Sequence, residues 1–152
     1  MFPIDESMLS QLACDVCGTM LDVVLAGPVS ANADAVRWIA SVQISGEIAA
    51  TVEIETDLVI ARWIACRMFF IDVFDVEEDH LRDALGEIVN VIGGNVKGIL
   101  SGGECDLSLP NVEETCSLPV ADADHTVVAR LSCEGLPFIV RLTETRCAAL
   151  TA

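Results

Sequence analysis

Positive charge is scarce in this sequence. Its 152 residues include 8 lysines and arginines against 24 aspartates and glutamates, so the formal net charge is −16. A chain with so few cations has no basic patch to neutralise phosphates, which argues against a nucleic-acid partner and equally against an anionic membrane surface. A protein or another cationic partner is favoured, although acidity by itself mainly promotes solubility.

Aromatic residues and long apolar runs are also few. Aromatic side chains make up 5% of the residues and hydrophobic ones 53%, so aliphatic residues and alanine are expected to fill the core. The most apolar window, residues 58–74, is interrupted by Arg62, Arg67 and Asp72, which excludes a membrane span there. The N-terminus has no basic segment followed by an apolar run, so no secretory signal is expected. The length predicts one domain, covering residues 1–152.

Motifs of several enzyme classes are missing as well. The chain has no glycine-rich phosphate loop and no nucleophile elbow. Cys14 and Cys17 form a CxxC, but they fall inside a predicted helix and no second ligand pair exists, so we interpret them as two buried helix cysteines. His80 and His125 are far apart in sequence, so no metal site is predicted. With seven cysteines and no signal peptide, a reducing cytoplasm is the expected compartment.

The longest helical pattern covers residues 77–100. Its apolar residues recur at spacings of three and four, as in an amphipathic helix: Leu81, Leu85, Ile88, Ile92, Val96 and Ile99. Acidic residues 77–79 suit the positive end of the helix dipole. At about 100° per residue, Glu87 and Asn90 project from the opposite face, one turn apart. The other residues of that face are Asp83, Gly94 and Lys97.

Two adjacent glycines interrupt this helix. Gly93 and Gly94 each cost roughly 1 kcal/mol against alanine in a helix interior, which predicts that another element or a partner approaches the bare backbone. Asn95 falls near the apolar stripe and is expected to be partly buried and internally hydrogen-bonded.

The remaining elements predict an α+β fold with a largely antiparallel sheet on which long helices pack. Two further helices are expected at residues 5–25 and 58–70. Their inward stripes are expected to be Met8, Leu12, Val16, Met20 and Val23 or Val24 in the first, and Val59, Trp63, Cys66 and Phe70 in the second. Strands are expected at residues 36–44, 48–55, 105–109, 113–118, 126–133 and 137–143, with the first two forming a hairpin. The order is helix, strands, helix, helix, strands.

The pair Glu87 and Asn90 has two interpretations. Any exposed helix face can show E-x-x-N, so the spacing alone favours an ordinary solvated surface. The context makes the pair more specific, because the sequence continues with Gly93, Gly94 and Asn95 and then Lys97.

This context resembles the CheX family of chemotaxis phosphatases, which is related to the CheC and flagellar-switch phosphatases. The resemblance rests on ALGEIVNVIGGNVKGIL at residues 84–100, on SGEIAATVEIETDLVIARWIACRMF at residues 45–69, and on the Leu-Pro at residues 109–110. Gly93 stands where the family pattern has alanine, which is a mild departure. No second E-x-x-N lies on the first helix, so a single site is implied, as in CheX.

The resemblance implies hydrolysis of the aspartyl phosphate on a CheY-type response regulator. It implies that Asn90 positions the attacking water and that Glu87 pairs with a receiver lysine, with Asp83, Gly94 and Lys97 in the partner-binding surface. No cofactor of its own is implied, because Mg²⁺ is expected on the receiver.

Two other functions stay open at this stage. One is a non-catalytic adaptor that binds a receiver or a chemotaxis protein through the same helix. The other is a homodimeric structural domain whose helix face is merely solvated. A homodimer is also implied by the resemblance, with late strands such as residues 137–143 offering a free sheet edge.

Overall fold

The computed structural model describes residues 3–30, 35–101, 104–115 and 125–145. The helices are α1 (Glu6–Leu21), α2 (Leu58–Phe69), the short 3₁₀ helix η1 (Val73–Asp75) and α3 (Glu78–Ser101). The strands are β1 (Arg37–Ser45), β2 (Ala50–Asp57), β3 (Asp106–Leu107), β4 (Asn111–Thr115), β5 (Thr126–Cys133) and β6 (Leu136–Glu144). Their order confirms the predicted α+β arrangement.

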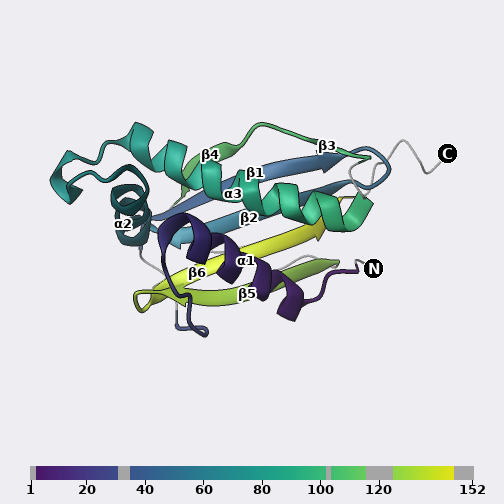
Figure 1. Ribbon diagram of the computed structural model, residues 1–152, viewed down its shortest axis with the longest axis horizontal. Helices are drawn as coiled ribbons and strands as arrows, with labels where there is room; N and C mark the ends of the chain where they lie inside the picture. Colours follow the sequence, from purple (N-terminus) through teal and green to yellow (C-terminus); the bar gives the residue numbers. More distant parts are fainter. Residues whose placement is uncertain (1–2, 31–34, 102–103, 116–124, 146–152) are drawn as a thin grey trace.

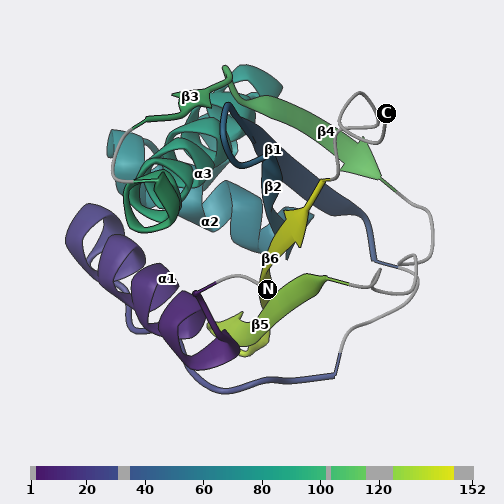
Figure 2. The same cartoon turned by 90° about the vertical axis from the view of Figure 1, so that its right-hand side faces the viewer.

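All strand pairs are antiparallel, and α1, α2 and α3 lie on one face of the sheet (Figures 1 and 2). The strand order is β3-β1-β2-β6-β5, with β4 also pairing with β1. The predicted β1–β2 hairpin is therefore confirmed. The expectation of a free edge at residues 137–143 is wrong, because β6 lies between β2 and β5.

The core lies between the sheet and α3. Leu85, Ile88 and Ile92 of α3 are fully buried, and they face side chains that alternate along the strands, such as Val42 and Val52. The apolar stripe of residues 77–100 thus anchors α3 against the sheet along most of its length. The stripe ends early, because Ile99 is 46% exposed near the end of the helix.

The face that α1 buries is rotated from the predicted one. The buried residues are Leu9, Ala13, Val16, Cys17 and Leu21. Asp5 caps the helix, with its carboxylate accepting from the Met8 N–H at 2.8 Å. The helix ends four residues before the predicted end, because Asp22 adopts a left-handed conformation and its N–H bonds the Gly18 carbonyl.

The predicted inward face of α2 is wrong for Val59 and Phe70, whereas Trp63 is half-buried and packs against the core. The buried residues are Ile60, Ala61, Ile64 and Ala65. Val59 is 65% exposed and Phe70 is 94% exposed. This helix is apolar on more than one side, so two stripes with the same period fit its sequence. The structure buries the stripe with small alanines, which let α2 pack closely on its neighbours.

Details of α3 and the strands after it differ from prediction as well. Asn95 is exposed, although its Nδ2 donates to the Val91 carbonyl at 2.9 Å, so only the internal hydrogen bond is confirmed. The strand expected at residues 105–109 is shortened to β3, and β4 begins at Asn111, directly after Pro110. Proline starts a strand readily because its missing N–H is not needed there. The predicted strand at residues 113–118 runs partly outside the described residues.

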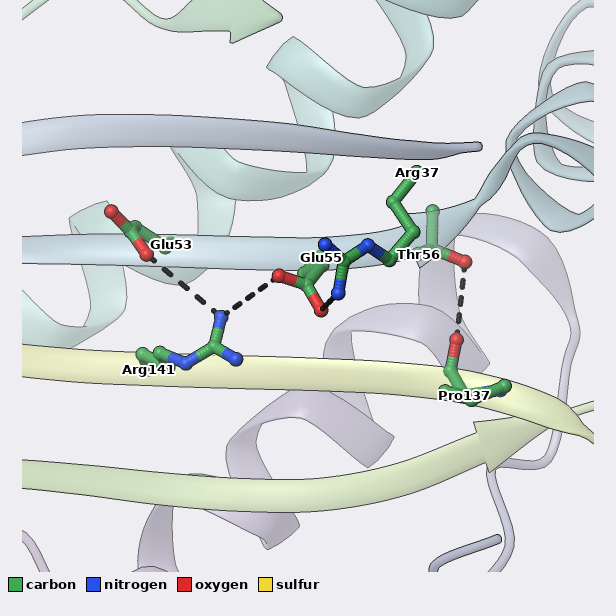
Figure 3. Close-up of polar contacts among 6 residues, drawn as sticks. All are labelled: Arg37, Glu53, Glu55, Thr56, Pro137 and Arg141. Atoms are coloured by element: carbon green, nitrogen blue, oxygen red, sulfur yellow. Dashed lines mark hydrogen bonds and ion pairs between the residues drawn. The ribbon is translucent and has the colours of Figure 1, made fainter. Parts of the chain in front are cut away.

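A cluster of charged side chains joins three strands on the sheet face opposite the helices (Figure 3). Glu55 of β2 lies at its centre, with Arg37 Nη1 3.6 Å from Oε2 and Arg141 Nη1 3.3 Å from Oε1. Arg141 also reaches Glu53 at 4.0 Å. Because the Glu55 side chain is only 6% exposed, these contacts offset the cost of burying its charge and fix β1, β2 and β6 relative to one another.

Candidate functional site

A groove lies between α3 and the start of β4. Its volume is about 490 Å³, and it is lined by Arg82, Asp83, Gly86, Glu87, Asn90, Leu109, Pro110, Asn111 and Val112. The groove therefore contains Glu87 and Asn90, the pair that the sequence predicts to be functional. One wall is a rigid helix and the other is a proline-started strand, so the site is built on elements that hold their side chains in place.

Gly86 lies at the floor of the groove and is buried. A Cβ atom there would lie 3.4 Å from Pro110 Cβ and 3.8 Å from Val112 Cγ2, which are ordinary contact distances. The backbone of α3 therefore lies close to Pro110 and the start of β4, one residue before Glu87.

Arg82 braces the same two elements. Its Nη1 donates a hydrogen bond to the Val112 carbonyl, and its Nη2 lies 3.2 Å from Glu78 Oε1. Its guanidinium also stacks over the ring of Trp38, with the Cζ atom 5.2 Å from the ring centroid. Since Trp38 is buried in β1, Arg82 ties α3 to both β1 and β4 at the groove.

Glu87 is exposed and Asn90 is half-buried. Within the described residues neither side chain has a hydrogen bond or an ion pair with another protein group, so both are available to a ligand or partner. A carboxylate accepts hydrogen bonds and attracts cations, whereas a carboxamide both accepts and donates without changing charge. The pair can thus hold a cationic group and a water molecule one helical turn apart.

The other predicted site residues divide into two groups. Asp83 is exposed and lines the groove with Glu87. Gly94 and Lys97 are half-buried and lie further along α3, outside the groove lining. A Cβ atom on Gly94 would meet nothing within 4 Å, so its side of the helix is open.

The second wall of the groove was not predicted from the sequence. Leu109 is 89% exposed at its edge, and the Asn111 Nδ2 lies 3.1 Å from Glu113 Oε1. The role of Arg82 in connecting the two walls was not predicted either. The only signal in the sequence was the Leu-Pro pair, which marks where a strand begins but not which helix that strand packs against.

The CxxC pair does not form a reactive site. Burial raises the pKa of Cys17 to about 12, and the neighbouring Cys133 and Cys14 act in the same direction. Burial likewise raises the pKa of Cys14. The thiolate is the reactive form of cysteine, so the raised pKa values disfavour reaction near neutral pH. The predicted burial is confirmed for Cys17, whereas Cys14 is half-buried.

Two other kinds of site were sought in the described part of the chain. No group of three or more His, Cys, Asp or Glu side chains there is placed to hold a metal ion. Among the same residues, no helix combines the length and the apolar character that crossing a membrane requires.

The chain and its fold match a known class of protein. A comparison with models of protein families matches residues 38–133 to "Chemotaxis phosphatase CheX". That match covers more than half of the chain and includes β1, β2, α2, α3 and the groove. The protein belongs to the CheX family of chemotaxis phosphatases, which confirms the resemblance seen in the sequence.

Solved structures show the same fold at low sequence identity. The CheX of the CheX–CheY–BeF3–Mg²⁺ complex from Borrelia burgdorferi is 21% identical, with a TM-score of 0.69, and the match covers 91% of this chain and 96% of that one. The CheX from Vibrio vulnificus is 17% identical, with a TM-score of 0.67, and the match covers 89% and 92%. The CheX from Desulfovibrio desulfuricans is 18% identical with a TM-score of 0.67, covering 90% and 96%. A search among curated proteins found no match.

Proposed function

We propose that this protein hydrolyses the aspartyl phosphate of a CheY-type response regulator, using the Glu87 and Asn90 side chains of α3. The observation that carries the proposal is that both side chains are unpaired within the described structure and line one groove, in a chain of the CheX family. The solved CheX–CheY complex from Borrelia burgdorferi supports a receiver as the partner.

The reaction needs little from the phosphatase. An acyl phosphate is already activated, so a water molecule has only to attack phosphorus in line while the bond to the aspartate oxygen breaks. Asn90 would hold that water through its amide oxygen. It stays neutral at any working pH, so it positions the water without competing for its proton.

Glu87 would fix the receiver. Its carboxylate lies one turn before Asn90 on the same rigid helix, so an ion pair with a receiver lysine would bring the phosphorylated aspartate next to Asn90. Asp83 would add a second negative charge in the groove, and Gly94 and Lys97 would contact the receiver further along α3. Mg²⁺ is expected on the receiver, so this chain would need no cofactor of its own.

Phosphate release tests the proposal. Wild-type protein should accelerate phosphate release from a phosphorylated CheY-type receiver, and Asn90→Ala should abolish most of the acceleration without changing the fold. Arg62→Ala is a control on the exposed side of α2, outside the groove, and should retain the wild-type rate. An unchanged rate in Asn90→Ala would contradict the proposed mechanism.

The alternative is a receiver-binding adaptor that uses the same groove without turnover. It predicts binding of an activated receiver by the wild-type protein with no acceleration of phosphate release. The two functions are therefore separated by measuring binding and release on the same samples.

We also propose that the protein acts as a homodimer in a reducing cytoplasm. The described edges available for pairing are β5 on one side and β3 with β4 on the other. The reducing compartment fits the free cysteines, among them Cys17 and Cys133. Sedimentation equilibrium tests the dimer.

A further inference from the structure

Aromatic side chains are exposed where α2 connects to α3. Phe70 is 94% exposed and Phe74 is 92% exposed, and the neighbouring Val73 and Phe69 are 47% and 38% exposed. We name Phe69, Phe70, Val73 and Phe74 the aromatic patch. In Figure 1 this connection extends beyond the end of the sheet. Single exposed apolar residues are ordinary, but two nearly bare phenylalanines within five positions in a chain that is 5% aromatic indicate a binding surface.

The backbone at Phe70 supports this interpretation independently. Phe70 has φ 55° and ψ 44°, the left-handed conformation that ends α2. Glycine is the usual residue at that position, because a bulky side chain there is strained. The chain therefore keeps a phenylalanine where folding favours glycine and where the ring is almost fully exposed. Strain of this kind is typical of functional positions.

The aromatic patch continues into the proposed site. His80, Asp83, Glu87 and Asn90 follow one another on α3 at spacings of three, four and three, so they form one ridge along the helix. The His80 ring contacts Phe69 at a centroid distance of 6.1 Å. Ten residues of helix span about 15 Å, and one side of a typical protein interface of about 800 Å² is roughly 30 Å across. An interface of this width can therefore include both Asn90 and Phe69 of the aromatic patch when Asn90 lies towards one side of it.

The surrounding charges define the partner's chemistry. Asp72, Asp75, Glu77, Glu78 and Asp79 are all exposed around the patch, while Arg67 lines a pocket beside Phe70 together with Asp22, so the charges around the patch are mostly negative. This acidic rim disfavours a second copy of the same patch, because like charges would meet, and it disfavours an anionic bilayer. It suits a protein surface whose apolar pocket is bordered by lysines or arginines.

We infer that the aromatic patch is a second contact for the response regulator, in which Phe70 and Phe74 enter an apolar, basic-rimmed surface of the receiver while Asn90 faces its phosphoryl group. The inference rests on the proposed function and extends it from the reacting groups to the docking surface. Buried aromatic side chains often dominate binding energy at interfaces, so these two residues would set the affinity for the receiver and not the chemical rate.

The test uses a CheY-type receiver activated with beryllofluoride and Mg²⁺ for binding, and the same receiver phosphorylated for turnover. The double variant Phe70→Ser/Phe74→Ser should raise Kd and KM about tenfold and leave kcat within about twofold. Val24→Ser is the matched control, because Val24 is 92% exposed elsewhere on the surface, and it should change neither constant. Phe70→Gly should weaken binding while leaving Tm unchanged or higher, whereas a merely structural role would lower Tm.

The outcomes separate this inference from the proposed function. If Kd and KM are unchanged in the double variant while Asn90→Ala is inactive, the docking surface is wrong and the proposed function stands. A loss of dimer mass in the double variant with unchanged receiver binding would also overturn it, because the patch would then join two copies. If the wild type binds the receiver without accelerating phosphate release, and the double variant binds it more weakly, the docking surface is supported and the phosphatase activity is rejected. A wild type that binds no receiver would overturn both.

Discussion

Gly93 of α3 and Val42 of β1 approach so closely that a Cβ atom on Gly93 would lie 2.5 Å from Val42 Cγ2. Side chains do not tolerate such a distance, so the glycine sets how near α3 lies to the sheet. Asn90 stands one turn earlier on the same helix. The height of the proposed site above the sheet is therefore fixed by a residue that takes no part in the chemistry.

Gly93→Ala should destabilise the protein. Alanine gains roughly 1 kcal/mol of helix propensity over glycine, but the clash with Val42 should cost about 1–3 kcal/mol and force α3 outward. We expect a net loss of free energy of unfolding in urea titrations, and a lower kcat because Asn90 moves with the helix. Unchanged stability would mean that the helix shifts without cost.

Gly94→Ala is the matched substitution one residue further on, and it should have the opposite effect. Nothing lies within 4 Å of the added Cβ, so the variant should gain about 0.5–1 kcal/mol of stability from helix propensity. If a receiver contacts bare backbone at Gly94, KM should rise while kcat stays constant. An unchanged KM would remove Gly94 from the partner-binding surface.

The glycine pair illustrates what the sequence could predict. Its position inside an amphipathic helix indicated close approach of another element, and the structure confirms this for Gly93. The two residues are adjacent, so they point about 100° apart, and only the packing distinguishes them. The stripe of α3 was predictable because polar residues bound it. The stripe of α2 was not, because Val59, Ile60 and Phe70 are all apolar and only tertiary contacts select which are buried.

The candidate site was half predictable for a related reason. Glu87 and Asn90 share a helix, so their spacing in the sequence fixes their spacing in space. The opposite wall comes from residues 109–112, about 20 positions later, and it meets α3 only because β4 pairs with β1 beneath the helix. Arg82 was missed because its acceptor, the Val112 carbonyl, leaves no trace in the sequence.

Arg82→Met should loosen the groove. Methionine keeps the apolar part of the side chain but loses the hydrogen bond to the Val112 carbonyl and the stacking on Trp38, which should cost about 1–2 kcal/mol in total. The wall formed by β4 would move relative to Asn90, so kcat/KM should fall with stability. Arg62→Met on the exposed side of α2 is the control and should change stability by less than about 0.5 kcal/mol. If both substitutions change the free energy of unfolding equally, Arg82 does not hold α3 and β4 together.

Glu55→Ala should strongly destabilise the sheet. It removes the buried carboxylate that pairs with both Arg37 and Arg141, and Arg141 keeps only its longer contact with Glu53 among the ion pairs of this cluster, so the expected cost is about 2–4 kcal/mol. Glu53→Ala is the control. Its side chain is 36% exposed and its ion pair with Arg141 is 4.0 Å long, so it should cost less than about 1 kcal/mol. Similar midpoints for the two variants in urea would contradict a central role for Glu55.

Glu87→Gln should weaken receiver binding more than it slows the reaction. The substitution keeps the size of the side chain and removes the charge that would pair with the receiver lysine, so KM should rise about threefold to tenfold while kcat falls less. An exposed ion pair is screened by salt, so KM of the wild type should increase between low and high ionic strength and that increase should be smaller in Glu87→Gln. Phosphate release measured at several salt concentrations checks both points. A charge swap, Glu87→Lys combined with a lysine-to-glutamate change in the receiver, should recover part of the lost affinity. No recovery, together with an unchanged salt dependence in Glu87→Gln, would show that Glu87 acts through some contact other than a lysine.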